Sequence, residues 1–302
     1  MNYPSNILPV AYLNGAFLPV AEAVVSPLDR GFLMGDGLFE TLHVYRGTPL
    51  DLDPHLARLD ESCDFFGISV PRRSELPEIF ARVINLNGLS GDGGPEFALR
   101  LTVSRGVHRA GPSTVLVHLR RLDPGHLSKR EIGVHLHVLP IGGRGDAHLV
   151  RHKSSSYAAS ALSDVWLRAR PEHKPTDEGL FVSSAGEVLE GASCNVFVLS
   201  EGCLVTPPVE AGVLPGISRS AVCSMANEMG YQLREGALLL SELEQAQEAF
   251  VTSSTLHVAP IVAVGERPIG GGTPGPGVRA IQRAFHERVL HQVADWRRGE
   301  QA

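Results

Sequence analysis

A succession of short strand patterns in the second half of the chain most constrains its fold. Four such segments follow one another closely, at residues 180–183, 188–190, 195–199 and 203–206. The turns between them carry Ala185-Gly186 and Glu201-Gly202. Closely spaced strands joined by glycine turns are typical of a β-rich domain. We therefore expect the second half of the chain to be β-rich.

The first half of the chain mixes strand and helix patterns. Two strands joined by an Asn14-Gly15 hairpin turn are expected within residues 11–20. Further strands are expected at residues 39–45, 96–104 and 114–119. Asp53 as N-cap and Pro54 at the first helical position begin a helix that continues to Phe66. A second helix is expected at residues 75–87. This mixture predicts an α+β first domain.

The length of 302 residues fits one large or two medium domains. Asp123-Pro124-Gly125 interrupts the strand pattern. We therefore expect a linker at residues 122–126, between an N-terminal α+β domain (residues 1–121) and a C-terminal β-rich domain (residues 127–302). A last helix is expected at residues 278–296.

Composition argues against several classes of partner. The net charge is −6, without a basic block, so no nucleic-acid partner is expected. No apolar stretch reaches membrane-spanning length, and no secretory signal pattern is visible. The four cysteines and 13 histidines form no CxxC or HExxH grouping, so no metal site is expected. Free thiols in a chain of this size indicate a reducing compartment, and we expect the cytoplasm.

Lys153 lies where a strand-like run ends and a helix-like run begins. A lysine at such a junction can be held with its amine in a cleft, as a Schiff base with an aldehyde cofactor requires. Most of the 27 lysines and arginines must be solvated surface charges, so the position of Lys153 alone does not identify it as a catalytic residue.

Two segments have the composition of an anion site. Gly216-Ile217-Ser218 leads into a helix whose first N–H groups suit a phosphate, although Ser218 as an ordinary N-cap is the alternative. Ser253 and Ser254 belong to a hydroxyl-rich run after an apolar strand and are candidates to complete a phosphate cradle. A polar turn is the alternative for that run.

Two charged residues occupy positions that look buried. Arg58 lies between core-facing leucines of the first helix and suits a bidentate phosphate clamp, with a solvated arginine as the alternative. Glu190 ends a strand against Gly191, where a carboxylate is costly unless it meets a cation. A protonated pyridine nitrogen is such a cation, and a surface glutamate is the alternative. Together with Lys153, these groups match the needs of pyridoxal 5'-phosphate.

The ordered motifs of the chain resemble those of the fold-type IV pyridoxal-phosphate enzymes, also called class IV aminotransferases. This family includes D-amino-acid and branched-chain aminotransferases and aminodeoxychorismate lyase. The resemblance covers nearly the whole chain and rests on Asp29-Arg30-Gly31, Gly35-Asp36-Gly37-Leu38-Phe39-Glu40, His55-Leu56-Ala57-Arg58-Leu59, Ser104-Arg105-Gly106, the Lys153 segment, Glu190-Gly191-Ala192-Ser193-Cys194-Asn195-Val196-Phe197, Leu214-Pro215-Gly216-Ile217-Ser218-Arg219 and Val251-Thr252-Ser253-Ser254.

The resemblance implies a two-domain α+β fold, with a pseudo-barrel as the C-terminal domain and the cofactor in the interdomain cleft. It also implies a homodimer. Lys153 would form the Schiff base and move protons, and Glu190 would keep the pyridine nitrogen protonated. The residues implied for the phosphate are Arg58, Ile217, Ser218, Ser253 and Ser254. The residues implied for the substrate are Phe39, Arg105 and Arg109.

The activity implied is transfer of an amino group between an amino acid or amine and a 2-keto acid. The alternative within the family is 4-amino-4-deoxychorismate lyase, which releases pyruvate and 4-aminobenzoate. A silent cofactor-binding protein would not need Lys153, Glu190 and Arg58 together. Branched-chain enzymes usually carry Gly-Gly-Asn-Tyr after the lysine, whereas this chain has Ser154-Ser155-Ser156-Tyr157.

Overall fold

The computed structural model describes residues 4–70, 72–89 and 95–300 of the chain. Contacts between residues divide the chain into two compact units. The first unit extends to Asp123 and also includes His152–Ser156 and the end of the chain from Val289, and the second comprises Pro124–Arg151 and Tyr157–Arg288. The change of unit after Asp123 falls inside the expected linker. However, two segments expected in the C-terminal domain, His152–Ser156 and the end of the chain, belong to the first unit.

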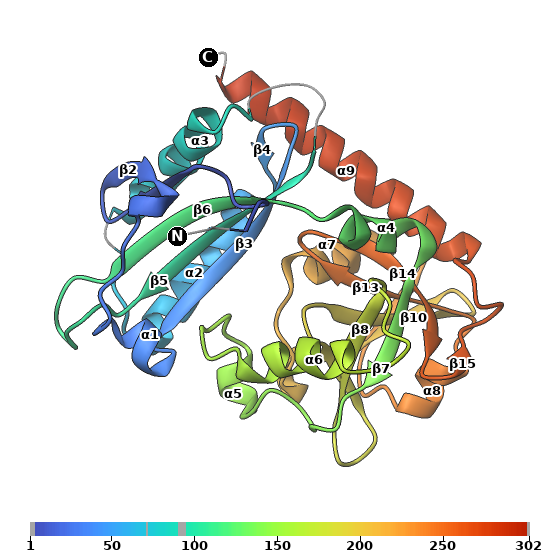
Figure 1. Ribbon diagram of the computed structural model, residues 1–302. Coiled ribbons are helices and arrows are strands. Elements are labelled where there is room, and N and C mark those ends of the chain that lie inside the picture. Colours follow the sequence, from blue (N-terminus) through green and yellow to red (C-terminus); the bar gives the residue numbers. More distant parts are fainter. Residues whose placement is uncertain (1–3, 71, 90–94, 301–302) are drawn as a thin grey trace. The chain divides into compact units, whose positions relative to one another are not determined.

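An antiparallel six-stranded sheet forms the first unit, in the order β2-β1-β6-β5-β3-β4 (Figure 1). Its strands are β1 (Val10–Leu13), β2 (Ala16–Pro19), β3 (Gly37–Tyr45), β4 (Thr48–Pro49), β5 (Phe97–Ser104) and β6 (Thr114–Arg121). The β1–β2 hairpin turns at Asn14 and Gly15, with φ of 50° and 101°. These positive angles suit an Asn-Gly turn, so the expected hairpin is confirmed.

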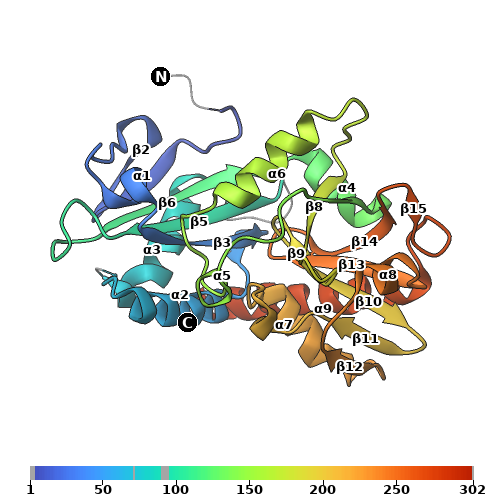
Figure 2. The same ribbon diagram turned by 90° about the horizontal axis from the view of Figure 1, so that it is seen from below.

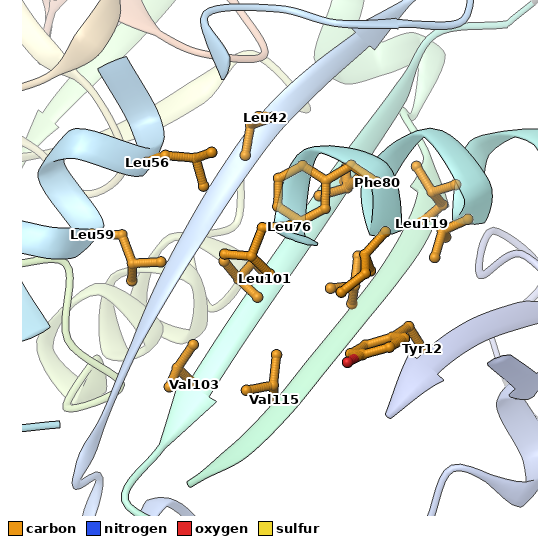
Figure 3. Close-up of a cluster of buried hydrophobic side chains, with 14 of the residues drawn as sticks. Tyr12, Leu42, Leu56, Leu59, Leu76, Phe80, Leu101, Val103, Val115 and Leu119 are labelled. Carbon is orange, nitrogen blue, oxygen red and sulfur yellow. The ribbon is translucent and has the colours of Figure 1, made fainter. Parts of the chain in front are cut away.

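Two helices, α2 (Leu52–Phe66) and α3 (Leu76–Leu86), lie on one side of this sheet (Figure 2). Their apolar side chains meet those of the strands in a single buried cluster, which includes Leu59, Phe80 and Leu101 (Figure 3). Complete burial of a side chain of this size contributes roughly 1.5–3 kcal/mol. The packed cluster therefore gives β3 and α2 a fixed relative position. Shorter helical segments of the chain are α1 (Arg30–Met34) and 3₁₀ turns at Val20–Glu22, Arg73–Glu75 and Val209–Ala211.

A nine-stranded mixed sheet forms the second unit, in the order β12-β11-β10-β13-β14-β7-β8-β9, with β15 paired to β14. Its strands are β7 (Val134–Val138), β8 (Asp177–Val182), β9 (Val188–Gly191), β10 (Asn195–Ser200), β11 (Cys203–Thr206), β12 (Gln232–Glu235), β13 (Glu248–Ser253), β14 (His257–Val264) and β15 (Arg267–Pro268). The pairs β11–β12, β14–β7 and β7–β8 are parallel. The β-rich second half is confirmed, and its closure into a pseudo-barrel stays a prediction.

Six helices accompany or follow this sheet. They are α4 (Pro124–Ile132), α5 (Ala147–Val150), α6 (Ala158–Arg168), α7 (Ile217–Ala226), α8 (Leu240–Glu244) and α9 (Pro276–Glu300). The end of α9 belongs to the first unit, where Gln292 accepts from the Asp51 N–H (2.7 Å) and donates to its carboxylate (3.2 Å). Within the described ranges, no helix is both long and apolar enough to cross a membrane.

The sequence does not predict β14, because Pro260 interrupts the apolar run. Proline lacks the N–H that a central strand needs. In the structure Pro260 pairs with Phe250 of β13, and pairing with β7 on the other side begins only at Ile261. The proline therefore lies just before the ladder with β7.

The expected linker is partly helical. Helix α4 begins at Pro124, a residue type that suits a first helical position because it needs no N–H there. The helix continues to Ile132, and Gly133 follows with φ of 89°. Strand β7 therefore begins at Val134, directly after this glycine.

Candidate active site

Lys153 lies on an irregular segment beside β3, and not at the end of a strand as expected. The Phe39 N–H donates to the Lys153 carbonyl (2.9 Å), and the Ser155 N–H donates to the Gly37 carbonyl (2.8 Å). Ser154 forms an isolated bridge with the same strand. Strand β3 therefore holds the backbone at and after Lys153.

The Lys153 amine lies over an aromatic ring. Its Nζ is 4.6 Å from the centroid of the buried Phe39 ring. The guanidinium of Arg100, on the neighbouring strand β5, also contacts this ring, with Cζ 3.7 Å from the centroid. A cation over an aromatic face is attracted by the ring quadrupole. The structure thus brings Lys153 and Phe39 together, as expected for residues of one site.

The residue before Lys153 is anchored to helix α2. His152 is buried, and its Nδ1 shares a 3.0 Å hydrogen bond with Ser62 Oγ. Its ring stacks on that of Phe65, with centroids 4.2 Å apart. Because β3 holds the following residues, the Lys153 backbone is fixed on both sides.

Arg58 is buried on α2 and pairs with Glu40 of β3. Its Nε donates to Glu40 Oε1 (2.9 Å) and its Nη2 to Oε2 (2.7 Å), while His55 Nδ1 contacts Oε2 at 2.6 Å. Burial by itself raises the pKa of Glu40, but Arg58 and His55 outweigh it and hold this pKa well below its usual range. The alternative of a solvated Arg58 is wrong. Its contact with a phosphate stays a prediction.

Arg105 and Arg109 have different surroundings. Arg105 Nε and Nη2 donate to the Asp36 carboxylate (2.8 and 3.2 Å), and Nη1 and Nη2 donate to the carbonyls of Gly67 and Phe66 (2.8 Å each). The hydrogen bond from Arg105 lowers the pKa of Asp36. Arg105 therefore ties its loop to the end of α2. Arg109 lies exposed in the same loop.

Glu190 is buried near the end of β9, so the alternative of a surface glutamate is wrong. Arg144 donates to its Oε1 from Nε (2.7 Å) and from Nη2, and the Leu214 N–H donates to Oε2 (3.0 Å). The Tyr157 hydroxyl donates to the carbonyl of Ala192 nearby (3.1 Å), and burial raises the pKa of Tyr157. The hydrogen bonds from Arg144 and the Leu214 N–H orient the Glu190 carboxylate and compensate the cost of its burial.

The N-terminus of α7 has the features of an anion site. Gly216 is the N-cap, and no side chain of the described residues caps the helix. The N–H groups of Ile217 and Ser218 therefore have no intrahelical acceptor. A Cβ atom at Gly216 would overlap Asn195 Oδ1, so glycine is required there. The alternative of Ser218 as N-cap is wrong, because Ser218 is the second helical residue and is buried.

The hydroxyl-rich run begins with the last two residues of β13. This strand pairs with β10 so that Thr252 lies opposite Asn195. Thr252 Oγ1 is buried and has no hydrogen-bond partner among the described residues. Ser253 Oγ accepts from the Leu256 N–H (3.2 Å), as the polar-turn alternative expects, and Ser254 follows half-buried. Because Asn195 also contacts Gly216, this run belongs to the same part of the second unit as the α7 N-terminus.

Comparison with known proteins identifies the family. A family model described as amino-transferase class IV matches residues 37–264. The chain belongs to the class IV aminotransferase family. Aminodeoxychorismate lyase from Bacillus subtilis (strain 168) is 30% identical over 290 residues, which are 93% of this chain and 95% of that protein. D-alanine aminotransferase from Bacillus licheniformis is 29% identical over 286 residues, 93% of this chain and 97% of that protein.

Solved structures show the same fold. A T.th. branched-chain amino acid aminotransferase with pyridoxamine 5'-phosphate has a TM-score of 0.82 and 25% identity, and the match covers 94% of this chain and 95% of that one. The expected family and the fold-type IV architecture are therefore confirmed.

The second unit of this class IV aminotransferase offers donors and acceptors that fit a phosphorylated pyridine. The buried Glu190 suits a protonated ring nitrogen, and the uncapped N–H groups of α7 suit a phosphate. Gly216 allows close approach to those N–H groups, and the unpartnered Thr252 hydroxyl lies in the same part of this unit. The residues that are present thus fit the cofactor implied by the family.

No role was expected for Glu40, Arg144 or Asn195 in this class IV aminotransferase, although Glu40 and Asn195 lie within its family motifs. A signal existed for Glu40, because Leu38, Glu40 and Leu42 alternate along β3 and both leucines belong to the core. A carboxylate at such an inward position needs a cation. Arg144 carried no comparable signal, since its partner Glu190 lies 46 residues further along the chain.

Proposed function

We propose that the chain is a pyridoxal-phosphate-dependent aminotransferase that moves an amino group between an amino acid or amine and a 2-keto acid. One observation carries this proposal. The second unit combines a buried, oriented carboxylate, Glu190, with an uncapped helix N-terminus at Gly216. The first attracts a cationic ring nitrogen and the second attracts a phosphate. The cofactor of this family carries both groups.

Pyridoxal phosphate supplies an aldehyde that takes up amino groups and a protonated ring that withdraws electrons. Glu190 would keep the ring nitrogen protonated, and the hydrogen bonds from Arg144 and the Leu214 N–H orient its carboxylate. Lys153 holds the cofactor covalently and then moves a proton at the substrate α carbon. The residues proposed to hold the phosphate are Arg58, Ile217, Ser218, Ser253 and Ser254.

On the substrate side we propose Phe39 and Arg109. The Phe39 ring contacts the Lys153 amine, which supports a place beside the reacting atoms. Arg109 is exposed and lies in a loop, so its guanidinium can reach a substrate carboxylate. Arg105 is engaged with Asp36 and two backbone carbonyls, which supports a role in holding this loop.

Incubation with single amino acids and no acceptor tests the reaction type. An aminotransferase converts its cofactor to the pyridoxamine form, which changes the absorption spectrum, and the D and L forms of each amino acid reveal the preferred hand. A 2-keto acid then restores the first spectrum. Absence of conversion with every amino acid and amine tried would exclude the aminotransferase proposal.

Aminodeoxychorismate lyase is the second candidate. The 30% identity to the Bacillus subtilis lyase over 93% of the chain supports it. Purified protein that releases pyruvate from aminodeoxychorismate, with its cofactor spectrum unchanged, would identify the lyase.

We also propose a homodimer in the cytoplasm. Several large apolar side chains around α1 are exposed, including Leu28, Phe32 and Met34, and such exposure favours a protein interface. The four cysteines are free thiols in the structure, which supports a reducing compartment.

A further inference from the structure

A cluster of imidazole and carboxylate groups lies in the second unit and includes no residue assigned above. His135 and His137 are two positions apart on β7, so their side chains leave the same face of the sheet. Strand β8 is parallel to β7, and Asp177 at its start pairs in register with His135. The sheet itself therefore brings these three residues together, although they contain no recognisable metal motif in the sequence.

The ligand atoms of the three residues converge. His137 Nε2 lies 3.3 Å and His135 Nδ1 lies 3.9 Å from Asp177 Oδ1, and one ligand atom from each residue falls within 4.8 Å of the others. Two ligands of one tetrahedral zinc ion are separated by about 3.4 Å, given metal–ligand distances near 2.1 Å. The observed spacing is thus close to that of a coordination sphere.

Two of these atoms are buried without a hydrogen bond. Within the described ranges, the only polar contact between His137 Nε2 and Asp177 Oδ1 is a poorly aligned one of 3.3 Å, and neither atom has a well-aligned hydrogen bond to another group. Buried polar atoms are nearly always satisfied by protein, water or an ion. An ion between these two atoms would satisfy both.

The second ring nitrogen of His135, Nε2, has the kind of hydrogen-bond partner that metal-binding histidines usually have. His135 Nε2 contacts the carbonyl oxygen of Gly265, which only accepts, so Nε2 carries the hydrogen and Nδ1 carries the lone pair that faces Asp177. Histidine ligands almost always donate their second ring N–H to a carbonyl or carboxylate in this way. The tautomer required for a ligand is therefore set by the backbone.

A third imidazole, that of His173 in the loop before β8, contacts the other carboxylate oxygen of Asp177. His173 Nδ1 lies 3.3 Å from Asp177 Oδ2 and is also buried without a hydrogen bond among the described residues. The His173 side chain is 28% exposed and that of His135 is 26% exposed, so an ion has a route from solvent. The same loop carries Arg170, whose guanidinium stacks on Trp166.

We propose that His135, His137 and Asp177 bind one divalent zinc ion. Two imidazoles and one carboxylate are ligands that zinc accepts in tetrahedral geometry, with water in the fourth position. The ion would link β7 to the start of β8. Its role is structural, because none of its ligands is a residue assigned to the cofactor or the substrate.

Titration of the cofactor-loaded full chain, without a histidine tag, with zinc chloride in a calorimeter tests this site. One zinc ion per chain should bind, and zinc should raise the midpoint of thermal unfolding. His137→Gln and Asp177→Asn should each weaken zinc binding at least about tenfold, whereas the exposed His291→Gln on α9 should bind as the unchanged protein does. No binding by the unchanged protein, or equal binding by both site variants, would overturn the proposal.

Two further measurements test the site even if His137→Gln or Asp177→Asn fails to fold. His135→Gln changes a partly exposed side chain, and it should keep the circular dichroism spectrum while losing zinc affinity at least about tenfold. Cobalt bound to the unchanged protein should give the visible bands of a tetrahedral nitrogen and oxygen site. A thiolate charge-transfer band in its place would assign the ion to cysteines and refute the histidine site.

Discussion

At the scale of single residues, the Glu190 carboxylate is both buried and hydrogen-bonded at each of its two oxygens. Arg144 donates to one oxygen and the Leu214 N–H donates to the other. A negative charge held in this way can keep a neighbouring ring nitrogen protonated, whereas a neutral amide cannot. The identity of residue 190 should therefore affect the chemistry more than it affects cofactor binding.

Glu190→Gln should keep the colour of the bound cofactor and lose turnover by roughly 100-fold or more, as expected for loss of an electrostatic group that acts on developing charge. Steady-state kinetics with the preferred amino donor measures the loss. Glu228→Gln, at an exposed position after α7, is the matched control and should be unaffected. Undiminished turnover in Glu190→Gln would contradict the role assigned to it.

Glu40 predicts a dependence of stability on pH. Its folded-state pKa lies below the ordinary value of 4.5, because Arg58 and His55 outweigh the effect of burial. A group with a lowered folded pKa stabilises the protein above its unfolded pKa, and this contribution is lost as pH falls below about 4.5. The free energy of unfolding should therefore decrease on acidification below that pH.

Glu40→Gln isolates this contribution. The variant leaves Arg58 buried without its anion and should be about 3–5 kcal/mol less stable at pH 7. Its free energy of unfolding in urea should also fall less between pH 5 and pH 3, since the titrating group is gone. The exposed Glu287→Gln on α9 should behave as the unchanged protein does. An equally steep acid dependence in Glu40→Gln would refute this account.

At the scale of elements, the N-terminus of α7 depends on the absence of a side chain at Gly216. A Cβ atom there would overlap Asn195 Oδ1. The Asn195 side chain is fixed because its Nδ2 donates to the Leu214 carbonyl and because β10 pairs with β13. Any added atom must therefore displace the first turn of the helix, which carries the N–H groups proposed for the phosphate.

Gly216→Ala should weaken binding of pyridoxal phosphate at least about tenfold, which corresponds to the loss of one charge-assisted hydrogen bond of about 1.5 kcal/mol or more. Fluorescence titration of the cofactor-free protein with pyridoxal phosphate measures this affinity. Ser224→Ala changes an exposed residue of the same helix and should bind normally. Normal affinity in Gly216→Ala would remove the α7 N-terminus from the proposed site.

Elements with local signals could be predicted, and elements set by distant pairing could not. Helix α2 follows from its apolar spacing, and the β1–β2 hairpin follows from Asn14-Gly15. The expected start of α2 is wrong, because the helix begins at Leu52 with Asp51 as N-cap, so that Pro54 is its third residue. Strand β14 was not predicted, because a proline fits this strand only where the pairing with β7 has not yet begun. The position of the Lys153 segment beside β3 was not predicted for a similar reason. It depends on backbone contacts with residues more than 100 positions away in the chain.

At the scale of the whole molecule, the segment around α1 points to self-association. Phe32 is 77% exposed and Leu28 is 61% exposed, although both are large apolar residues. Exposed apolar groups gathered in one short segment are typical of an interface. A symmetric dimer would bury this segment twice.

Phe32→Asp should shift the protein from dimer to monomer, because the charge would have to be buried in the interface. Light scattering coupled to size exclusion measures the mass directly. Leu86→Asp, at another exposed apolar residue of the first unit, is the control and should leave the dimer intact. A monomeric unchanged protein, or an intact dimer in Phe32→Asp, would refute the proposed interface.

Lys153 is the residue proposed to carry the cofactor, and the small number of lysines in the chain makes the attachment site simple to locate. The sequence contains three lysines, Lys129, Lys153 and Lys174. Lys129 is buried in an ion pair with Glu178 (3.1 Å), and Lys174 is exposed. Borohydride reduction of the cofactor-loaded protein, followed by peptide mass spectrometry, locates the attached pyridoxyl group. One pyridoxyl group should be found on Lys153. Absence of the group, or its attachment to Lys129 or Lys174, would show that Lys153 does not carry the cofactor.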